Sequence, residues 1–253
     1  MAIDLSEYRA SAEEQSRMAD LLRLMPAHGH TAIDIGARDG LFSVLMAERF
    51  DTVTALDLEE PIVCHPKVLC VKGNAAHLQF ADGSFDFVFC AEVLEHVPTS
   101  VLRDACREIE RVSRDRILIG VPYKQDTRVG RTTCYSCGET NPPYGHVNTF
   151  DEARIAKLFP GCKVEDISFV GTNGWRTNWL SAVLMDFAGN PYGTYEQDER
   201  CIHCGHRLKP PPRRTALQLV ATKLAFWARR LTEPFSKPKG NWMHVVLRKS
   251  ASA

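Results

Sequence analysis

The sequence lacks a long apolar run and carries no net charge. No stretch approaches the ~20 consecutive apolar residues that cross a bilayer, and the first seven residues have neither the basic region nor the apolar core of a secretory signal. The 31 Lys and Arg residues are balanced by 31 Asp and Glu residues. We therefore expect a cytoplasmic protein whose 253 residues form a single α/β domain with sizeable insertions.

The charge balance is uneven along the chain. From Gly205 to Ala253, eleven Lys and Arg residues accompany one acidic residue, Glu233. A basic segment of this kind can hold an anionic substrate, a membrane surface or a nucleic acid. It can also be an ordinary solvated face.

The chain also lacks the pattern of a disulfide-bonded protein. In a cytoplasmic chain, nine cysteines do not indicate a disulfide framework. Five of them sit in apolar surroundings and are predicted to be small core residues: Cys64, Cys70, Cys90, Cys106 and Cys162. The other four form two C-x-x-C-G motifs.

Short apolar strands alternate with helical patterns over most of the chain. This alternation predicts a doubly wound, Rossmann-like, seven-stranded and mostly parallel sheet with helices on both faces. The expected strands are 31–35, 52–58, 67–71, 85–90, 116–121, 163–170 and 242–247. Helices are expected after Ser11-Ala-Glu-Glu14, over 41–50, after Ser100 with Val101 facing inward, and after Thr149-Phe-Asp-Glu152, where the first and last patterns are typical of capping boxes.

The alternation is interrupted twice. Residues 122–148 and 172–240 are predicted to be insertions, and residues 1–29 a helical N-terminal cap. The second insertion contains one amphipathic helix, in which an apolar stripe follows a spacing of three and four: Leu217, Val220, Leu224, Trp227 and Leu231. Such a stripe usually packs into a core. The basic residues of 213–231 leave a peripheral membrane contact or a substrate lid as alternatives.

The segment Ala32-Ile-Asp-Ile-Gly-Ala-Arg-Asp-Gly40 predicts a strand that opens into a glycine turn. Ligands of doubly wound sheets bind beyond the carboxyl ends of the strands, where such a turn lets the backbone approach closely. Asp57 ends the second predicted strand and is placed to accept both hydroxyls of a ribose. Dinucleotide enzymes use an acid there too, but the spacing Gly36-x-x-x-Gly40 lacks their G-x-G-x-x-G motif.

Four segments together resemble the class I S-adenosylmethionine (SAM)-dependent methyltransferases, and most of all their type 11 branch. They are Ala32–Gly40, Ala55–Asp57, Gly73-Asn-Ala75 and Phe85-Asp-Phe-Val-Phe-Cys-Ala-Glu-Val-Leu-Glu-His-Val97. The resemblance implies SAM as cofactor. It places Asp34 near the cationic amino acid end of SAM, Asp57 at the ribose and the Asn74–Ala75 pair at the adenine. The other cofactor-binding residues that it implies are Gly36, Ala37, Arg38, Gly40, Leu58, Cys90 and Glu92.

The sequence departs from the family pattern at two positions. Arg38 replaces the middle glycine of the usual G-x-G-x-G turn, and Asn74 replaces the usual aspartate. The amide oxygen of Asn74 can still accept a hydrogen bond, although without charge. Both changes are compatible with binding, and they leave a non-catalytic SAM-binding scaffold as an alternative function.

Two histidines are candidates for a general base that removes the proton of a hydroxyl acceptor. His96 follows the fourth predicted strand, where family members approach the methyl group. His146 lies in an H-x-x-x-F segment that is common in this branch. The alternative for His96 is a histidine bonded to backbone at the start of a helix. Tyr123, Glu92 and Arg176 are weaker candidates.

The two C-x-x-C-G motifs, one in each insertion, predict a structural zinc site. Thiolates at this spacing can hold one tetrahedral zinc ion, and four of them leave no open position for catalysis. The predicted ligands are Cys134, Cys137, Cys201 and Cys204, with His146, His203 and His206 as competing candidates. A redox role of the pairs is the alternative. The zinc is expected to clamp the two insertions into a lid.

The acceptor is expected to be a small molecule, anionic or sugar-containing, because the second insertion is basic and carries Trp175, Trp179 and Trp227. O-methylation of a glycan, a lipid-linked sugar or a secondary metabolite is the preferred interpretation. RNA methylation is the alternative. Against it, the catalytic Asn/Asp-Pro-Pro-Tyr of nucleic-acid enzymes is missing after the fourth predicted strand, where Cys90-Ala-Glu-Val93 stands.

Overall fold

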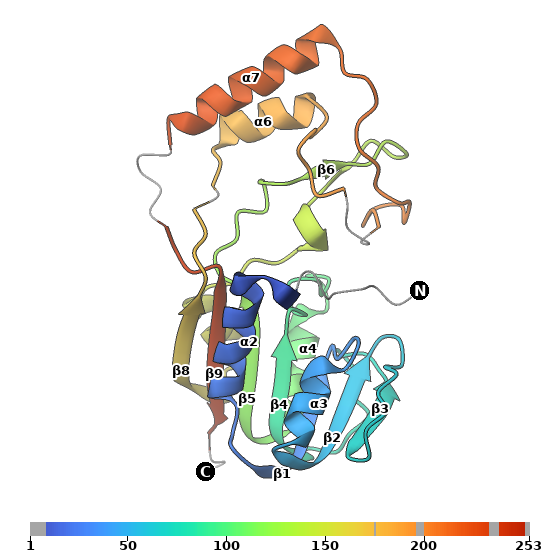
Figure 1. Cartoon of the computed structure of the whole chain (residues 1–253), viewed down its shortest axis with the longest axis vertical. Coiled ribbons are helices and arrows are strands. Elements are labelled where there is room, and N and C mark those ends of the chain that lie inside the picture. The colour runs from blue at the N-terminus through green and yellow to red at the C-terminus, as the bar shows by residue number, and fades with distance from the viewer. Residues whose placement is uncertain (1–8, 175, 196–199, 233–237, 251–253) are drawn as a thin grey trace. The chain divides into compact units, whose positions relative to one another are not determined.

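The computed structural model describes residues 9–174, 176–195, 200–232 and 238–250 (Figure 1). The chain divides into two compact units. The sheet unit comprises the residues up to Tyr123, 150–171 and the residues from Gly240 onward, and the insertion unit comprises 124–149 and 172–239. The expected signal-free start of the chain, part of the expected N-terminal cap, and Trp175 lie outside the described residues.

The sheet unit contains the predicted seven-stranded, mostly parallel sheet. Its strand order is β3-β2-β1-β4-β5-β9-β8. The first five strands in this order are parallel, and β9 runs antiparallel to both β5 and β8. The strands are β1 (Gly29–Ile35), β2 (Phe50–Asp57), β3 (Val68–Lys72), β4 (Phe85–Ala91), β5 (Ser113–Pro122), β8 (Cys162–Val170) and β9 (Trp242–Lys249). The predicted fold class is confirmed.

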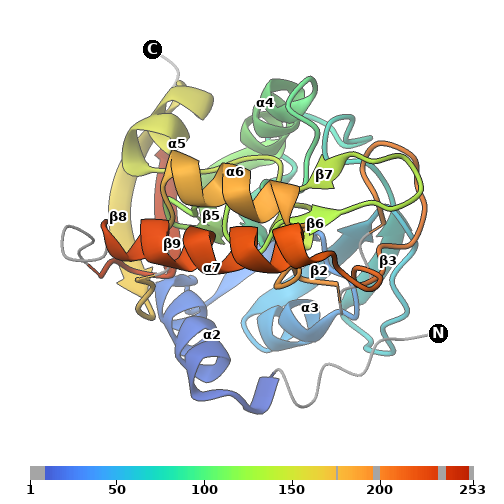
Figure 2. The ribbon, with the colours of Figure 1, turned by 90° about the horizontal axis from the view of Figure 1, so that it is seen from above.

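Helices cover both faces of this sheet. Successive side chains of a strand point to opposite faces, so Leu118 of β5 packs in one apolar cluster, while Ile117 and Ile119 pack in another. The first cluster contains residues of α2 (Ala12–Leu24) and α3 (Leu41–Ala47), and the second contains residues of α4 (Leu102–Val112) and α5 (Glu152–Leu158). Figure 2 shows the two helix pairs on opposite sides of the strands.

Helix starts follow the predicted signals in one case and differ in two. Ser11 caps α2 and accepts a hydrogen bond from the backbone N–H of Glu14 at 3.2 Å. The α5 helix is capped by Asp151, which accepts from Arg154 N–H at 2.8 Å, so the predicted cap at Thr149 is wrong. Val101 is the N-terminal cap residue of α4 and is 36% exposed rather than inward.

The helix after the glycine turn is shorter than predicted. It ends at Ala47 rather than at Phe50, which instead begins β2. Phe50 is buried and its ring stacks on that of Phe87 of β4, with centroids 5.5 Å apart. The apolar pattern 41–50 is therefore shared between a helix and the following strand.

The insertion unit holds a two-stranded sheet, a short 3-10 helix and two helices. These elements are β6 (Thr132–Thr133), β7 (Thr140–Asn141), η1 (Pro143–Gly145), α6 (Trp179–Phe187) and α7 (Ala216–Arg230). The helices α6 and α7 lie side by side and antiparallel (Figures 1 and 2). The Asn178 amide donates to the Ala228 carbonyl at 2.7 Å at one end, and the Gln218 amide donates to the Phe187 carbonyl at 3.5 Å at the other.

The prediction that the apolar stripe of α7 packs into a core is wrong. Its five side chains are between 51% and 74% exposed: Leu217, Val220, Leu224, Trp227 and Leu231. The buried side of α7 is instead formed by small residues, Ala221, Thr222, Ala225 and Ala228. Small side chains allow the two helices to pack closely, and the large apolar residues lie on another, exposed face of α7.

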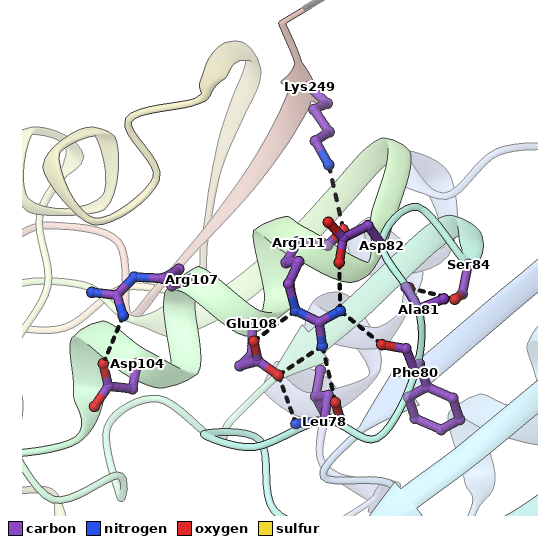
Figure 3. A network of polar contacts seen from close by, with 10 residues as sticks. All are labelled: Leu78, Phe80, Ala81, Asp82, Ser84, Asp104, Arg107, Glu108, Arg111 and Lys249. Carbon is purple, nitrogen blue, oxygen red and sulfur yellow. Dashed lines mark hydrogen bonds and ion pairs between the residues drawn. The ribbon is translucent and has the colours of Figure 1, made fainter.

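One arginine joins α4 to the segment that follows β3 (Figure 3). The Arg111 guanidinium donates to the Glu108 carboxylate at 2.7 and 2.8 Å, to the carbonyls of Leu78 and Phe80 at 2.9 and 2.7 Å, and to Asp82 at 2.8 Å. Glu108 also accepts from the backbone N–H of Leu78 at 2.8 Å. The chain segment 78–82, directly after the predicted adenine segment, is thus fixed to a helix.

We predict that Arg111→Ala lowers the free energy of unfolding by roughly 2–3 kcal/mol, because it removes charge-assisted hydrogen bonds to two carbonyls and two carboxylates. Urea denaturation measures this difference. The matched control is Arg107→Ala on the same helix, whose side chain is 74% exposed and pairs with Asp104 at 3.2 Å. The control should cost less than about 0.5 kcal/mol. Equal losses in the two variants would contradict the assignment.

Candidate functional site

The predicted cofactor residues lie where β1, β2 and β4 end at the same edge of the sheet. The turn after β1 requires glycine at two positions. Gly36 has φ +81°, and a Cβ there would lie 2.2 Å from the Val93 side chain. Gly40 has φ +77°, and a Cβ there would lie 2.1 Å from the Val63 side chain. Both a left-handed backbone and a lack of space therefore exclude larger residues.

Arg38 occupies the position where the family usually has glycine, and it adopts the conformation that glycine would have. Its φ is +50° and its side chain is exposed. Its backbone N–H donates to Asp57 Oδ2 at 2.9 Å. The departure from the family pattern therefore leaves the course of the turn intact and adds a positive charge at its surface.

Asp57 connects the first turn to the end of β2. Its Oδ1 accepts from the Leu58 N–H at 2.6 Å, and its Oδ2 accepts from Arg38. A carboxylate can accept about four hydrogen bonds, so these two bonds leave capacity for two hydroxyl donors. Leu58 is next to it and is 66% exposed. This arrangement fits the predicted contact with a ribose and an adjoining apolar ring.

Asp34 lies within β1 and is fully buried. It accepts a hydrogen bond from the Ser43 hydroxyl of α3 at 2.6 Å. Burial raises its pKa to about 7, and the bond from Ser43 opposes the rise only in part. Asp34 is therefore poised between its neutral and charged forms near neutral pH, so a cation bound nearby would draw it toward the carboxylate.

The predicted adenine segment forms a tight turn. Asn74 is exposed, and its Oδ1 accepts from the Ala76 N–H at 2.9 Å. Ala75 is partly buried and packs on the main apolar cluster. The side-chain oxygen of Asn74 thus orders the turn and keeps a second lone pair for another donor.

Two predicted cofactor residues lie at the end of β4 and directly after it. Cys90 is completely buried in the core, and burial raises the pKa of its thiol well above the usual value. Glu92 has φ +57°, a strained conformation for this residue type. Its Oε2 accepts from the indole N–H of Trp242 at 3.2 Å, whereas its buried Oε1 makes no hydrogen bond. Burial raises the pKa of Glu92 to about 6.

The two candidate bases belong to different units. His96, in the sheet unit, is an exposed residue whose backbone N–H donates to the Val93 carbonyl at 3.0 Å. Desolvation and the charge of Arg38 lower its pKa, so its imidazole is neutral near pH 7, as a base requires. His146, in the insertion unit, is buried, and its Nδ1 lies 2.6 Å from Gln125 Oε1. An amide oxygen only accepts, so this contact places the proton of a neutral ring on Nδ1.

The weaker candidates have structural partners or lie at the surface. The Tyr123 hydroxyl donates to Glu152 at 2.8 Å, and Arg176 is exposed.

The four predicted zinc ligands come together within the insertion unit. Their sulfur atoms all lie within 4.8 Å of one another, and the closest pairs are Cys134 with Cys204 at 3.6 Å and Cys137 with Cys201 at 3.7 Å. Four thiolates at Zn–S distances near 2.3 Å form a tetrahedron with S···S edges of about 3.8 Å. The cluster therefore has the size of a zinc tetrahedron, and no disulfide joins these cysteines.

The two motifs have the same local geometry. In each, the glycine N–H donates to the carbonyl of the first cysteine at 2.8 Å, and both glycines, Gly138 and Gly205, have positive φ. Burial opposes ionisation of Cys134, but the backbone N–H groups of Ser136 and Cys137 outweigh it and lower the pKa of this thiol to about 6. The group contains neither His203 nor His206.

Comparison with known proteins finds a family match for one part of the chain. Residues 33–116 match a family described as "Methyltransferase domain". Over this segment the chain has the sequence pattern of a methyltransferase. The segment contains the glycine turn, Asp57, the adenine segment and His96.

The relatives cover the chain to different extents. A ubiquinone biosynthesis O-methyltransferase of Albidiferax ferrireducens is 31% identical over 103 residues, and the match spans 36% of this chain and about two fifths (40%) of that protein. The structure of a 1,6-didemethyltoxoflavin-N1-methyltransferase from Burkholderia thailandensis, with bound S-adenosylhomocysteine, has a TM-score of 0.54 at 14% identity and covers 97% of this chain and 81% of its own.

The N-methyltransferase NodS from Bradyrhizobium japonicum, also with S-adenosylhomocysteine, has a TM-score of 0.52 at 12% identity and covers 97% and 92% of the two chains. Both structures share the fold with this chain.

Sequence reasoning missed a buried cation behind the methyltransferase segment. Arg17 of α2 forms a bidentate ion pair with Glu14, and its guanidinium lies 5.8 Å from the Trp242 ring centroid. Its charge opposes the rise in the pKa of Glu92. Glu95 is also completely buried, and neither of its carboxyl oxygens has a hydrogen-bond partner among the residues that the structure describes; burial raises its pKa well above the usual value. The i,i+3 spacing of Glu14 and Arg17 was the available signal, but such pairs are normally exposed.

The raised pKa of Asp34 predicts a pH-dependent stability. Between its ordinary pKa of 3.8 and about 7, the folded protein holds a proton that the unfolded chain has lost. Ionisation at rising pH therefore destabilises the fold, by up to about 1.4 kcal/mol per pH unit in this window. Asp34→Asn should remove this contribution, so its free energy of unfolding should fall less steeply with pH than that of the wild type.

Urea denaturation at a series of pH values measures the two slopes. Glu60→Gln, which changes an exposed acid after β2, is the control and should keep the wild-type slope. If Asp34→Asn also runs parallel to the wild type, Asp34 does not hold the proton.

Proposed function

We propose that this chain is a SAM-dependent methyltransferase that O-methylates a small molecule such as a glycan, a lipid-linked sugar or a secondary metabolite. The observation that carries the proposal is the position of the methyltransferase segment. Its match over 33–116 coincides with the edge of the sheet where the glycine turn and the free acceptor capacity of Asp57 meet.

The residues of this edge suit the parts of SAM. Asp57 would accept hydrogen bonds from the ribose hydroxyls, and Leu58 would pack against the adenine ring. Asn74 and Ala75 would lie at the adenine edge. Asp34, with its pKa near 7, would gain charge beside the cationic amino acid end, together with the backbone of Gly36, Ala37, Arg38 and Gly40. The side chain of Cys90 is buried, so its backbone would make the contact with SAM. Glu92 would contribute from behind the glycine turn.

SAM supplies a methyl group that is already activated by the positive sulfur. Bound SAM would donate its methyl carbon to the acceptor oxygen as the carbon–sulfur bond breaks, with S-adenosylhomocysteine as the leaving group, and the hydroxyl proton would pass to a base. The neutral imidazole of His96 is suited to accept this proton, and Nε2 of His146 is the second candidate.

The acceptor assignment rests on a curated relative and on the side chains of the insertion unit. The relative is named as an O-methyltransferase of ubiquinone biosynthesis. The insertion unit is basic, and Trp179 and Trp227 are exposed, which suits an anionic or sugar-containing acceptor.

We also propose that the four cysteines bind one structural zinc ion, which would clamp the two insertions into a lid. The support is the tetrahedral size of the sulfur cluster and the pair of equivalent turns. Because four thiolates complete the coordination of zinc, this metal would not activate the acceptor.

SAM binding is tested by calorimetry on purified protein. Asp57→Ala should weaken binding by roughly 1–3 kcal/mol through the loss of charged hydrogen bonds. Asp51→Ala changes an exposed acid in the same strand and should bind as the wild type does. Unchanged binding in Asp57→Ala would remove this residue from the site.

Transfer of a labelled methyl group to hydroxyl-bearing glycans and lipid-linked sugars distinguishes an enzyme from a scaffold. For an enzyme that uses His96, His96→Ala should abolish transfer and keep SAM affinity, and His146→Ala reports on the second candidate. A chain that binds SAM and never transfers its methyl group would be a scaffold.

Zinc is tested by metal analysis of the purified protein. The wild type should contain about one zinc ion per chain, and Cys134→Ser should lower both the zinc content and the melting temperature. Cys64→Ser, an exposed cysteine outside the cluster, is the control and should change neither. A folded protein without zinc would exclude the clamp.

A further inference from the structure

The helices α6 and α7 concentrate exposed apolar side chains. Of the 22 large hydrophobic residues that are exposed among the described residues, four lie on α6 and six on α7. Scattered exposed hydrophobics are normal, but a contiguous set on one element marks an interaction surface.

On α7 four of these six side chains form one stripe, and Leu219 and Phe226 lie outside it. Leu217, Val220, Leu224 and Trp227 follow the spacing of one helix face, and Leu231 continues it just after the helix. At 1.5 Å per residue the stripe is about 21 Å long. The small residues that pack within the insertion unit lie on a different face of the helix, and the stripe stays exposed.

Positive charges border the stripe. Lys223 and Arg230 are four residues before and three residues after Trp227, so both are its neighbours on the helix surface. The Arg230 guanidinium lies over the Trp227 ring, 5.4 Å from its centroid. Residues 201–232 contain seven Lys and Arg residues and no Asp or Glu.

We propose that α7 binds the surface of an anionic lipid membrane, with the helix axis in the plane of the surface. Leu217, Val220, Leu224 and Leu231 would enter the boundary between headgroups and acyl chains. Trp227 would lie at the headgroup level, and Lys223 and Arg230 would contact lipid phosphates. No helix in the described part of the chain is long and apolar enough to cross a membrane, so the contact is peripheral.

The charges favour a lipid surface over a second copy of the chain. Two copies packed through this stripe would bring Lys223 and Arg230 of one close to the same basic residues of the other. Like charges across an interface are unfavourable, whereas anionic headgroups complement them. Membrane binding of this kind does not depend on the proposed methyl transfer.

Cosedimentation of the full, zinc-loaded chain with vesicles tests the proposal. The wild type should bind vesicles of equal parts phosphatidylcholine and phosphatidylglycerol more tightly than vesicles of phosphatidylcholine alone, and added salt should weaken this preference. Leu224→Glu should lower the partition coefficient at least about tenfold, because it removes buried apolar area and adds a like charge for the lipid.

Leu69→Glu is the matched control, since Leu69 is 62% exposed in strand β3 of the sheet unit and should tolerate the change without effect on binding. The double variant Lys223→Gln/Arg230→Gln should weaken binding to the anionic vesicles by about 25-fold, since each basic residue near such a surface contributes about fivefold. Lys157→Gln, an exposed lysine on α5, is its control.

Circular dichroism and zinc content of each variant establish that it is folded. If the folded wild type does not sediment with anionic vesicles, or if Leu224→Glu binds as well as Leu69→Glu, the proposal is wrong. Concentration-dependent dimerisation that Leu224→Glu abolishes, in a chain that ignores vesicles, would assign the stripe to a second copy instead.

Discussion

The candidate cofactor site depends on the close approach of Gly36 to Val93. This contact leaves no room for a Cβ, and it holds the turn after β1 against the segment that follows β4. The hydrogen bond from Arg38 N–H to Asp57 then ties the same turn to the end of β2. Three strand ends thus meet through contacts between the backbone of this turn and the side chains of Val93 and Asp57, and the sheet register brings Asp57, Asn74 and His96 to the same edge.

Behind this edge lie carboxyl groups whose charge is suppressed. Burial raises the pKa values of Asp34, Glu92 and Glu95, and the cation beside them, Arg17, is already paired with Glu14. A buried carboxyl that keeps its proton avoids the cost of an unpaired charge. A cationic ligand bound near Asp34 would therefore favour the charged form of this group.

Local patterns predicted the fold and the front of the site, whereas contacts between distant segments escaped them. A few consecutive residues are enough to identify the glycine turn, Asp57 and each of the two cysteine motifs. The hydrogen bond from the Trp242 indole to the Glu92 carboxyl joins residues 150 positions apart, and no local sequence pattern predicts it. For α7, periodicity identified an apolar stripe, but it does not state whether that stripe packs; the structure instead buries a face of small residues, Ala221, Thr222, Ala225 and Ala228. The close packing that small side chains allow decided this.

The exposed stripe of α7 and the cysteine cluster are both related to the small apolar core of the insertion unit. The insertion unit buries few large apolar residues, and its buried cluster consists of Cys134, Tyr195, Cys201 and Leu208 with Cys204 against them. A core of this size cannot stabilise a unit alone, and small units with such cores commonly rely on a metal. The leucines and tryptophans that would have enlarged the core lie on the outer face of α7 instead. A zinc ion at the four cysteines would stabilise the insertion unit without these side chains, which are then available for an external surface.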